Sequence, residues 1–144
     1  MAASPPLAER PLWLNFTLLV CAYIAFIYSP WDYFGKPVAE AEDVWFGFVL
    51  RGETARLTEP IHFLIYASFV WGIWFMRPWM RTWGTIYLVQ MTIAFAIWPI
   101  FDERGRPWMS LPSLLIWGWL TWKYWNASRI FTEEPPAGSE PLGA

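Results

Sequence analysis

The segment Glu59-Pro60-Ile61-His62 contains the side chains best suited to chemistry. A carboxylate and the only histidine of the chain stand three residues apart, so a helix would place both on one face. Such a pair could donate a proton or hold a ligand at the mouth of a helical bundle. It could also be a polar helix start that fixes a membrane-spanning helix at the interface. The sequence leaves both interpretations of Glu59 and His62 open.

Metal and cofactor chemistry has little support in the residue types. Glu-x-x-His occurs once, whereas di-iron carboxylate bundles use it twice with further glutamates. The single cysteine, Cys21, excludes an internal disulfide and a thiolate metal cluster, and one histidine excludes bis-histidine haem ligation within the chain. We therefore expect no metal and no cofactor.

A third candidate for acid chemistry is Asp32, which follows the first long apolar run. If the loops after the first and third runs lie on one side, Asp32, Glu59 and Asp102 surround the same mouth of the bundle. Clustered carboxylates repel each other, which raises some of their pKa values and keeps a proton available. The alternative is that these are solvated loop charges.

The composition indicates a membrane protein. The chain has 144 residues, of which 56% are hydrophobic and 15% charged, whereas soluble domains have about 25% charged residues. Its net charge of −2 argues against a nucleic-acid partner. The bilayer is therefore the first expected partner.

Four uncharged runs predict four membrane spans. A spanning helix needs about 20 residues. The runs at about 11–31 and 82–101 reach this length, and those at about 60–76 and 109–126 do so if basic side chains at their ends extend to the headgroups. The predicted fold is an all-α, polytopic membrane four-helix bundle, with residues 1–131 as a single transmembrane domain.

The first loop and the tail differ from simple connectors. Residues 44–50 are apolar but too short to span, which predicts an interfacial or re-entrant helix over about 43–51, capped near Asp43. Residues 132–144 form a polar C-terminal tail. Arg77 and Arg81, between the second and third spans, favour both termini in the cytoplasm of a bacterial inner membrane.

Aromatic residues supply the candidate ligand contacts. Most of the thirteen tryptophans fall near the ends of spans, where the indole ring prefers to lie. A few aromatic and polar residues lie deeper and are candidates for lining a pocket. In the third span, Gln90 could anchor a lipid-like ligand or form a hydrogen bond between helices. The ligand-binding candidates are Trp71, Trp74, Tyr87, Gln90, Trp117 and Trp119.

The stretch from Trp79 to Gln90, WMRTWGTIYLVQ, resembles the W-x-R-T-x-x-x-I-Y-x-V-H pattern of EXPERA-domain proteins, the family of the sigma-2 receptor and emopamil-binding sterol isomerase. Asp32 resembles an acidic residue of that family after the first span. Gln90 replaces the family's histidine, and no acid stands inside 60–76. The resemblance implies a four-span fold and binding of a sterol or isoprenoid. Separately, residues 31–66 are similar to segments of small bacterial membrane proteins.

Two functions are therefore expected. Because no catalytic set is complete, the first is a non-catalytic accessory or assembly subunit of a respiratory or photosynthetic membrane complex, whose partners are other subunits or further copies of the chain. The second is an EXPERA-like protein that binds or isomerises a sterol or isoprenoid, using an acid and an aromatic pocket. Spans without internal charges disfavour a channel.

Overall fold

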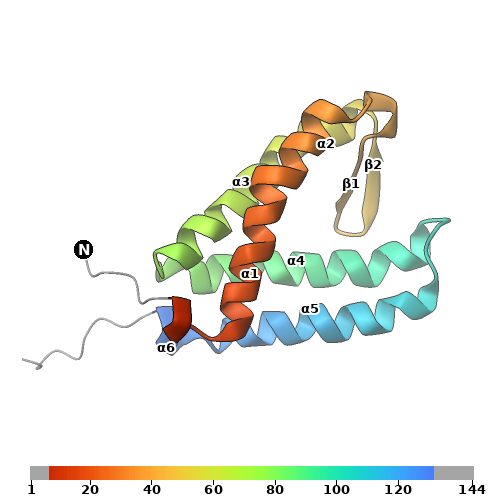
Figure 1. Cartoon of the computed structure of the whole chain (residues 1–144). Coiled ribbons are helices and arrows are strands. Elements are labelled where there is room, and N and C mark those ends of the chain that lie inside the picture. Colours follow the sequence, from red (N-terminus) through yellow and green to blue (C-terminus); the bar gives the residue numbers. More distant parts are fainter. Residues whose placement is uncertain (1–6, 132–144) are drawn as a thin grey trace, which may run out of the picture.

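The computed structural model describes residues 7–131, apart from the side chains of residues 128 and 129. The described chain is mainly helical, as the sequence predicts, and contains one antiparallel β-hairpin (Figure 1). The polar tail expected at 132–144 lies outside the described residues.

The first long helix is a continuous rod with an internal irregularity. After the 3-10 turn η1 (Leu7–Glu9), the rod comprises α1 (Leu12–Tyr23), the π-helical η2 (Ile24–Tyr28) and α2 (Ser29–Gly35). In η2 the N–H of Ser29 bonds to the carbonyl of Ile24, five residues earlier. Pro30 has no N–H to donate to a carbonyl of the preceding turn, and a π-bulge is one way in which a helix accommodates the missing hydrogen bond.

A β-hairpin occupies the segment expected to be an interfacial or re-entrant helix, so that prediction is wrong. After the 3-10 turn η3 (Val38–Glu40), β1 (Glu42–Trp45) pairs with β2 (Phe48–Arg51). The segment is rich in valine and aromatic residues, which favour strands. Phe46 and Gly47 both have positive φ, 52° and 92°, which a two-residue hairpin turn requires.

The hairpin tip packs against α4 (Trp79–Phe101). A Cβ added to Gly47 would lie 2.5 Å from the Cβ of Ile97. Glycine therefore permits both the turn and the close approach to α4.

The other helices follow in chain order. Helix α3 (Glu53–Trp74) begins well before the span expected from residue 60, and its first turns carry charged residues. After α4, the 3-10 turn η4 (Pro107–Met109) leads into α5 (Ser110–Trp125), and α6 (Ser128–Phe131) follows.

Two helical segments are long and apolar enough to cross a membrane. They are the 24-residue rod Leu12–Gly35 and the 23-residue helix α4. These correspond to the two runs that reach spanning length by themselves in the sequence.

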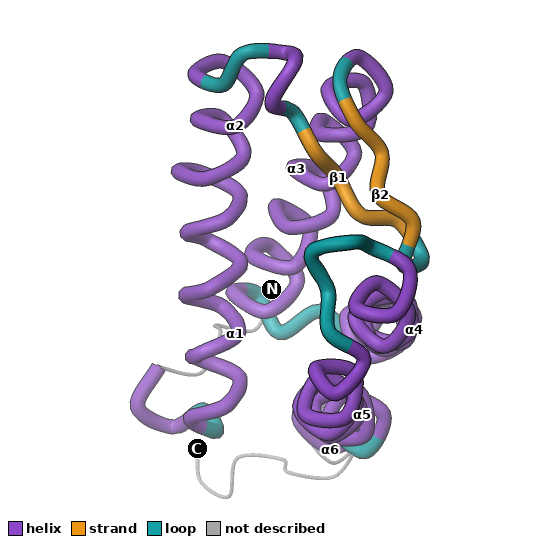
Figure 2. The backbone as a smooth tube through the Cα atoms, turned by 90° about the vertical axis from the view of Figure 1, so that its right-hand side faces the viewer, coloured by secondary structure: helices purple, strands orange, loops and turns teal. Residues whose placement is uncertain are grey.

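The helices form two antiparallel pairs (Figures 1 and 2). Helices α4 and α5 lie side by side, whereas α1 packs on α3, and the pairs diverge toward the end where the hairpin lies. The hydrophobic core fills the region where the pairs meet. Its members come from α1, α3, α4 and the α5–α6 end: Leu14, Leu18, Cys21, Ile65, Phe69, Ile73, Met80, Tyr87, Leu88, Tyr124, Ala127 and Phe131.

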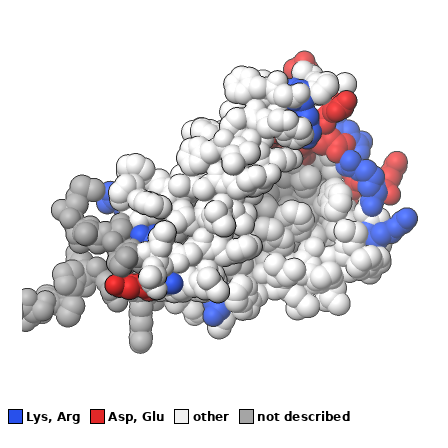
Figure 3. Space-filling view, viewed as in Figure 1, with Lys and Arg blue, Asp and Glu red and all other residues white. Residues whose placement is uncertain are grey.

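Charged side chains gather at two ends of the molecule, and the face between them carries almost none (Figure 3). At one end Arg10 donates hydrogen bonds to the carbonyls of Ile73 and Trp74, at 3.2 and 3.0 Å. This contact places a positive charge at the C-terminus of α3, where the helix dipole favours it. An uncharged belt between two charged ends is the surface that a lipid bilayer would accommodate.

Candidate functional site

A cavity of about 380 Å³ lies between the Leu12–Gly35 rod, the hairpin, α3 and α4. Figure 3 shows this face hollowed between the rod and the lower helix pair, with charges along one edge. The cavity walls are mainly apolar and aromatic, and one end is polar. The walls contain Tyr23, Ile24, Tyr28, Val44, Tyr66, Met91, Ala94 and Phe95, and the polar end contains Ser29, Asp32, Glu42, Asp43, Glu59 and His62.

Asp43 is the centre of the polar end. Its Oδ1 accepts hydrogen bonds from the Val44 N–H at 2.8 Å and from Nδ1 of His62 at 2.9 Å. Its Oδ2 accepts from Nε1 of Trp45 at 2.7 Å and from the Thr58 hydroxyl at 2.5 Å. Burial raises the pKa of Asp43, but the bonds from His62 and Thr58 outweigh it and lower that pKa below its usual value. The carboxylate is therefore held ionised in a fixed orientation.

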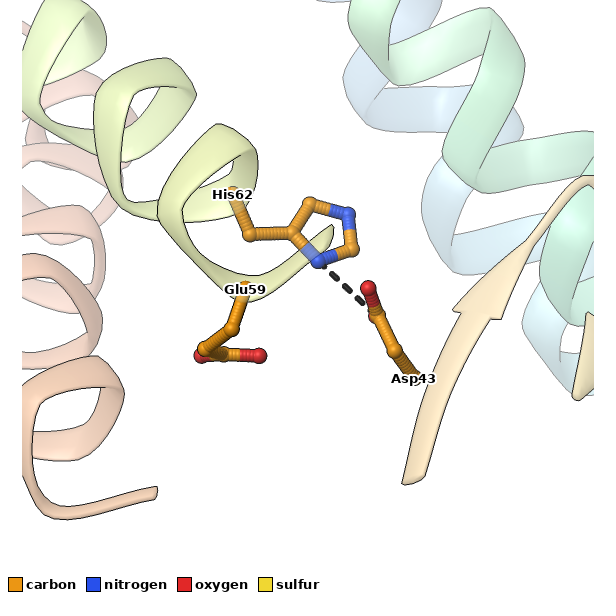
Figure 4. Close-up of side chains that lie close together, drawn as sticks. All are labelled: Asp43, Glu59 and His62. Carbon is orange, nitrogen blue, oxygen red and sulfur yellow. Dashed lines mark ion pairs between the residues drawn. The ribbon is translucent and has the colours of Figure 1, made fainter. Parts of the chain in front are cut away.

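His62 is held between the hairpin and its own helix. Its ring stacks on Trp45 with centroids 4.3 Å apart and planes 2° apart, and the tilted Tyr66 ring has its centroid 6.1 Å away. Because Nδ1 bonds to a carboxylate, Nδ1 carries a proton, and in the neutral form of the ring the lone pair is on Nε2. Figure 4 shows Nε2 turned away from Asp43.

Glu59 lies on the same face of α3 as His62, one residue before the span expected from residue 60. It is only 8% exposed, and no cationic side chain in the described chain lies within ion-pair distance of it. Burial, followed by the negative charges of Asp32 and Asp43, raises the pKa of Glu59. The neutral hydroxyl of Ser29 faces it.

The other acids at this end have permanent cationic partners. Asp32 is buried and forms an ion pair with Lys36, which bonds back along one helical turn. Glu42 pairs with Arg51 and with Arg104, at 3.2 and 2.6 Å. Asp32 and Glu59 both line this cavity, as expected, whereas Asp102 does not line it and pairs with Arg51 and Arg104.

Tyr87 and Gln90 take different positions on α4. The Tyr87 hydroxyl donates to the hydroxyl of Tyr66, a cavity residue, at 3.1 Å. Gln90 is buried, and neither of its amide atoms has a hydrogen-bond partner among the described residues. It is not part of the cavity lining.

The four candidate tryptophans do not line this cavity. Trp71, Trp74 and Trp119 are about half exposed, at 54, 47 and 50%. Trp117 stacks on Phe95 with ring centroids 5.2 Å apart, so it supports a cavity wall from behind. Their role as ligand contacts stays a prediction.

Sequence reasoning missed Asp43 as a site residue, treating it as a helix cap. It also missed Trp45 and Thr58, which hold Asp43 in place. No local motif distinguishes these residues, because the hairpin alone brings Asp43 and Trp45 to α3.

Comparison with known proteins adds no assignment. No protein-family model, curated protein or solved structure matches the chain significantly.

Proposed function

We propose that this chain is an integral membrane protein that binds an amphipathic alcohol of the sterol or isoprenoid type. The single supporting observation is the cavity, whose apolar walls end in Asp43, Glu59 and His62. Its volume falls within the roughly 300–1,000 Å³ usual for small-molecule sites. Apolar walls with a few convergent polar groups are the usual composition of such sites.

The charge of the polar end selects the head group. Carboxylates repel a phosphate or a fatty-acid carboxylate, whereas a neutral hydroxyl can donate its single hydrogen to the Glu59 carboxylate or to the lone pair on His62 Nε2. Asp32, the acid carried by the EXPERA resemblance, lines the same cavity.

Photoaffinity labelling tests this proposal. We expect photoreactive analogues of farnesol and of cholesterol to label the purified protein at cavity residues, with competition by the free alcohol and not by palmitate. Met91→Trp should fill the cavity and reduce labelling at least tenfold. Ile93→Trp, on an exposed position of the same helix, is the matched control and should label normally. Equal competition by palmitate, or equal labelling of the Met91 variant, contradicts the proposal.

The accessory-subunit function is a second candidate, favoured by the surface of α5. This helix buries only Tyr124 among its side chains and turns large apolar side chains outward, including Leu115 and Trp119. That face is available to lipid or to another subunit. Purification in mild detergent should then recover stoichiometric partners, and loss of these partners in Leu115→Glu would support the candidate. A partner-free, monodisperse protein would contradict it.

We also propose a bacterial inner-membrane location with both termini in the cytoplasm. The first and last described elements, η1 and α6, lie at the same end of the molecule (Figure 1). Arg77, in the turn between α3 and α4, and Arg81, in the first turn of α4, belong to this end, which the positive-inside tendency places in the cytoplasm. Fluorescent and periplasmic reporter fusions at each terminus test this orientation, and an active periplasmic reporter would reverse it.

A further inference from the structure

Two buried carboxylates at the polar end have no permanent cation. Asp32 is neutralised by Lys36, and Glu42 by two arginines, whereas Asp43 and Glu59 lie within ion-pair distance of neither lysine nor arginine in the described part of the chain. Both are at least nine-tenths buried, at 7 and 8% exposure. Their combined charge is that which one divalent cation would compensate, and burying an uncompensated charge is costly.

These two carboxylates converge on His62. One ligand atom from each of Asp43, Glu59 and His62 lies within 4.8 Å of the others (Figure 4). Two atoms bound to one ion at about 2.1 Å can be at most about 4.2 Å apart, so closing the three side chains on one ion needs an inward shift of at most about 0.6 Å. The Asp43 Oδ1 and His62 Nδ1 atoms, 2.9 Å apart, already meet that limit.

The groups around the three side chains hold them in place. Trp45 and Thr58 bond to the other oxygen of Asp43, and the stacked Trp45 ring fixes the imidazole plane. Outer contacts of this kind orient metal ligands. From this arrangement we infer that Asp43, Glu59 and His62 bind one divalent transition-metal ion at the polar end of the cavity.

The ligand types indicate the class of ion. Two carboxylates and one imidazole suit Zn²⁺, Mn²⁺ or Fe²⁺, and the absence of a second imidazole or thiolate weakens the case for a closed structural site. On binding, His62 would give Nδ1 to the ion and carry its proton on Nε2, so a hydroxyl contact to an Nε2 lone pair belongs to the metal-free protein. The remaining coordination position would face the cavity. The inference stands without the proposed alcohol ligand, and its test uses metal alone.

Zinc binding to the full chain tests the site. The protein should be purified without a histidine tag, treated with chelator and titrated with Zn²⁺ by calorimetry. We expect one ion per chain with micromolar or tighter affinity. The affinity for Zn²⁺ should fall at least tenfold in each of Asp43→Asn, Glu59→Gln and His62→Asn. It should fall about tenfold in Thr58→Val, because that variant loses the hydrogen bond that orients Asp43.

Glu40→Gln is the matched control, because it removes an exposed carboxylate close to the hairpin but outside the cluster. It should bind Zn²⁺ within twofold of wild type. If His62→Asn binds as tightly as wild type, or if wild type shows no saturable binding, the inference is wrong.

A spectroscopic measurement on wild type covers the case in which the variants fail to fold. The chain contains a single histidine, so a bound imidazole can only be His62. Electron paramagnetic resonance of the protein with one equivalent of Cu²⁺ should show coupling to one imidazole nitrogen. A spectrum without nitrogen coupling would overturn the inference, whatever the affinity.

Discussion

The indole ring of Trp45 lies flat against the imidazole of His62, with centroids 4.3 Å apart and planes 2° apart. The two residues belong to β1 and α3, so the stack joins the hairpin to a core helix. Hydrogen bonds from Thr58 and His62 to Asp43 strengthen the same junction. The hairpin is thereby a wall of the cavity.

Trp45→Ala should loosen the hairpin. The change removes the stack and the indole hydrogen bond to Asp43, and we expect a loss of about 2 kcal/mol in the free energy of unfolding. Unfolding by SDS titration in detergent micelles measures it. Trp108→Ala is the control, because Trp108 is 72% exposed. Equal losses in the two variants would contradict the role given to Trp45.

Gly47→Ala should disturb the packing of the hairpin tip against α4. Gly47 has a φ of 92°, and a Cβ there would lie 2.5 Å from Ile97. We expect a destabilisation of about 2 kcal/mol. Gly118→Ala is the matched control, since nothing lies within 4 Å of its added Cβ in the middle of α5. That variant should be stabilised by up to about 1 kcal/mol, and the opposite order would refute the packing described.

The hydroxyl contact between Tyr66 and Tyr87 should couple α3 to α4. Their oxygens are 3.1 Å apart and their rings meet edge to face. A double-mutant cycle with phenylalanine at both positions keeps the rings and removes the bond. We expect a coupling free energy of roughly 0.6 kcal/mol, as for hydrogen bonds between membrane helices. Additive effects of the two single variants would show that the contact contributes nothing.

Acid should lower the stability of the fold through Asp102, which lies in the loop after α4. Side-chain and backbone hydrogen bonds from Arg104 lower the pKa of Asp102 to about 2. Because an aspartate in an unfolded chain titrates near 3.9, this stabilisation is present above about pH 4 and is lost as pH falls toward 2. The melting temperature in detergent should therefore decline across that interval.

Asp102→Asn should melt at a lower temperature near neutral pH and should decline less between pH 4 and 2. Glu103→Gln is the neighbouring control, since Glu103 forms no ion pair within the described residues. Its acid profile should follow that of wild type. An unchanged profile in Asp102→Asn would show that the Arg104 pair does not stabilise the fold.

The long helices could be predicted because their signal is local. Residues 11–31 and 82–101 are long uncharged runs, and they correspond to the rod Leu12–Gly35 and to α4. The start of a helix could not be predicted where polar residues extend it beyond the apolar run. Helix α3 begins at Glu53, several residues before the uncharged run, because its charged first turns interrupt the apolar pattern from which the span was predicted.

The hairpin was not predicted, because its short apolar segment was expected to form an interfacial or re-entrant helix. Residues 44–50 are apolar without alternation, and such runs do not distinguish a strand from a helix by periodicity. The signal that was missed is Phe46-Gly47 between β-favouring residues. The conformation of this segment also depends on α4, since Gly47 packs against Ile97.

The sequence by itself determined a mainly helical chain with two segments of membrane-spanning length, and it singled out Glu59 and His62, because hydrophobic length and helical spacing are local properties. Only the tertiary structure decided that Asp43 completes their cluster and that the polar end opens into an apolar cavity. These relationships join a hairpin to α3 and to the first helical rod. These contacts arise from packing between segments that are distant in the sequence. The local pattern of one sequence contains no signal for such packing.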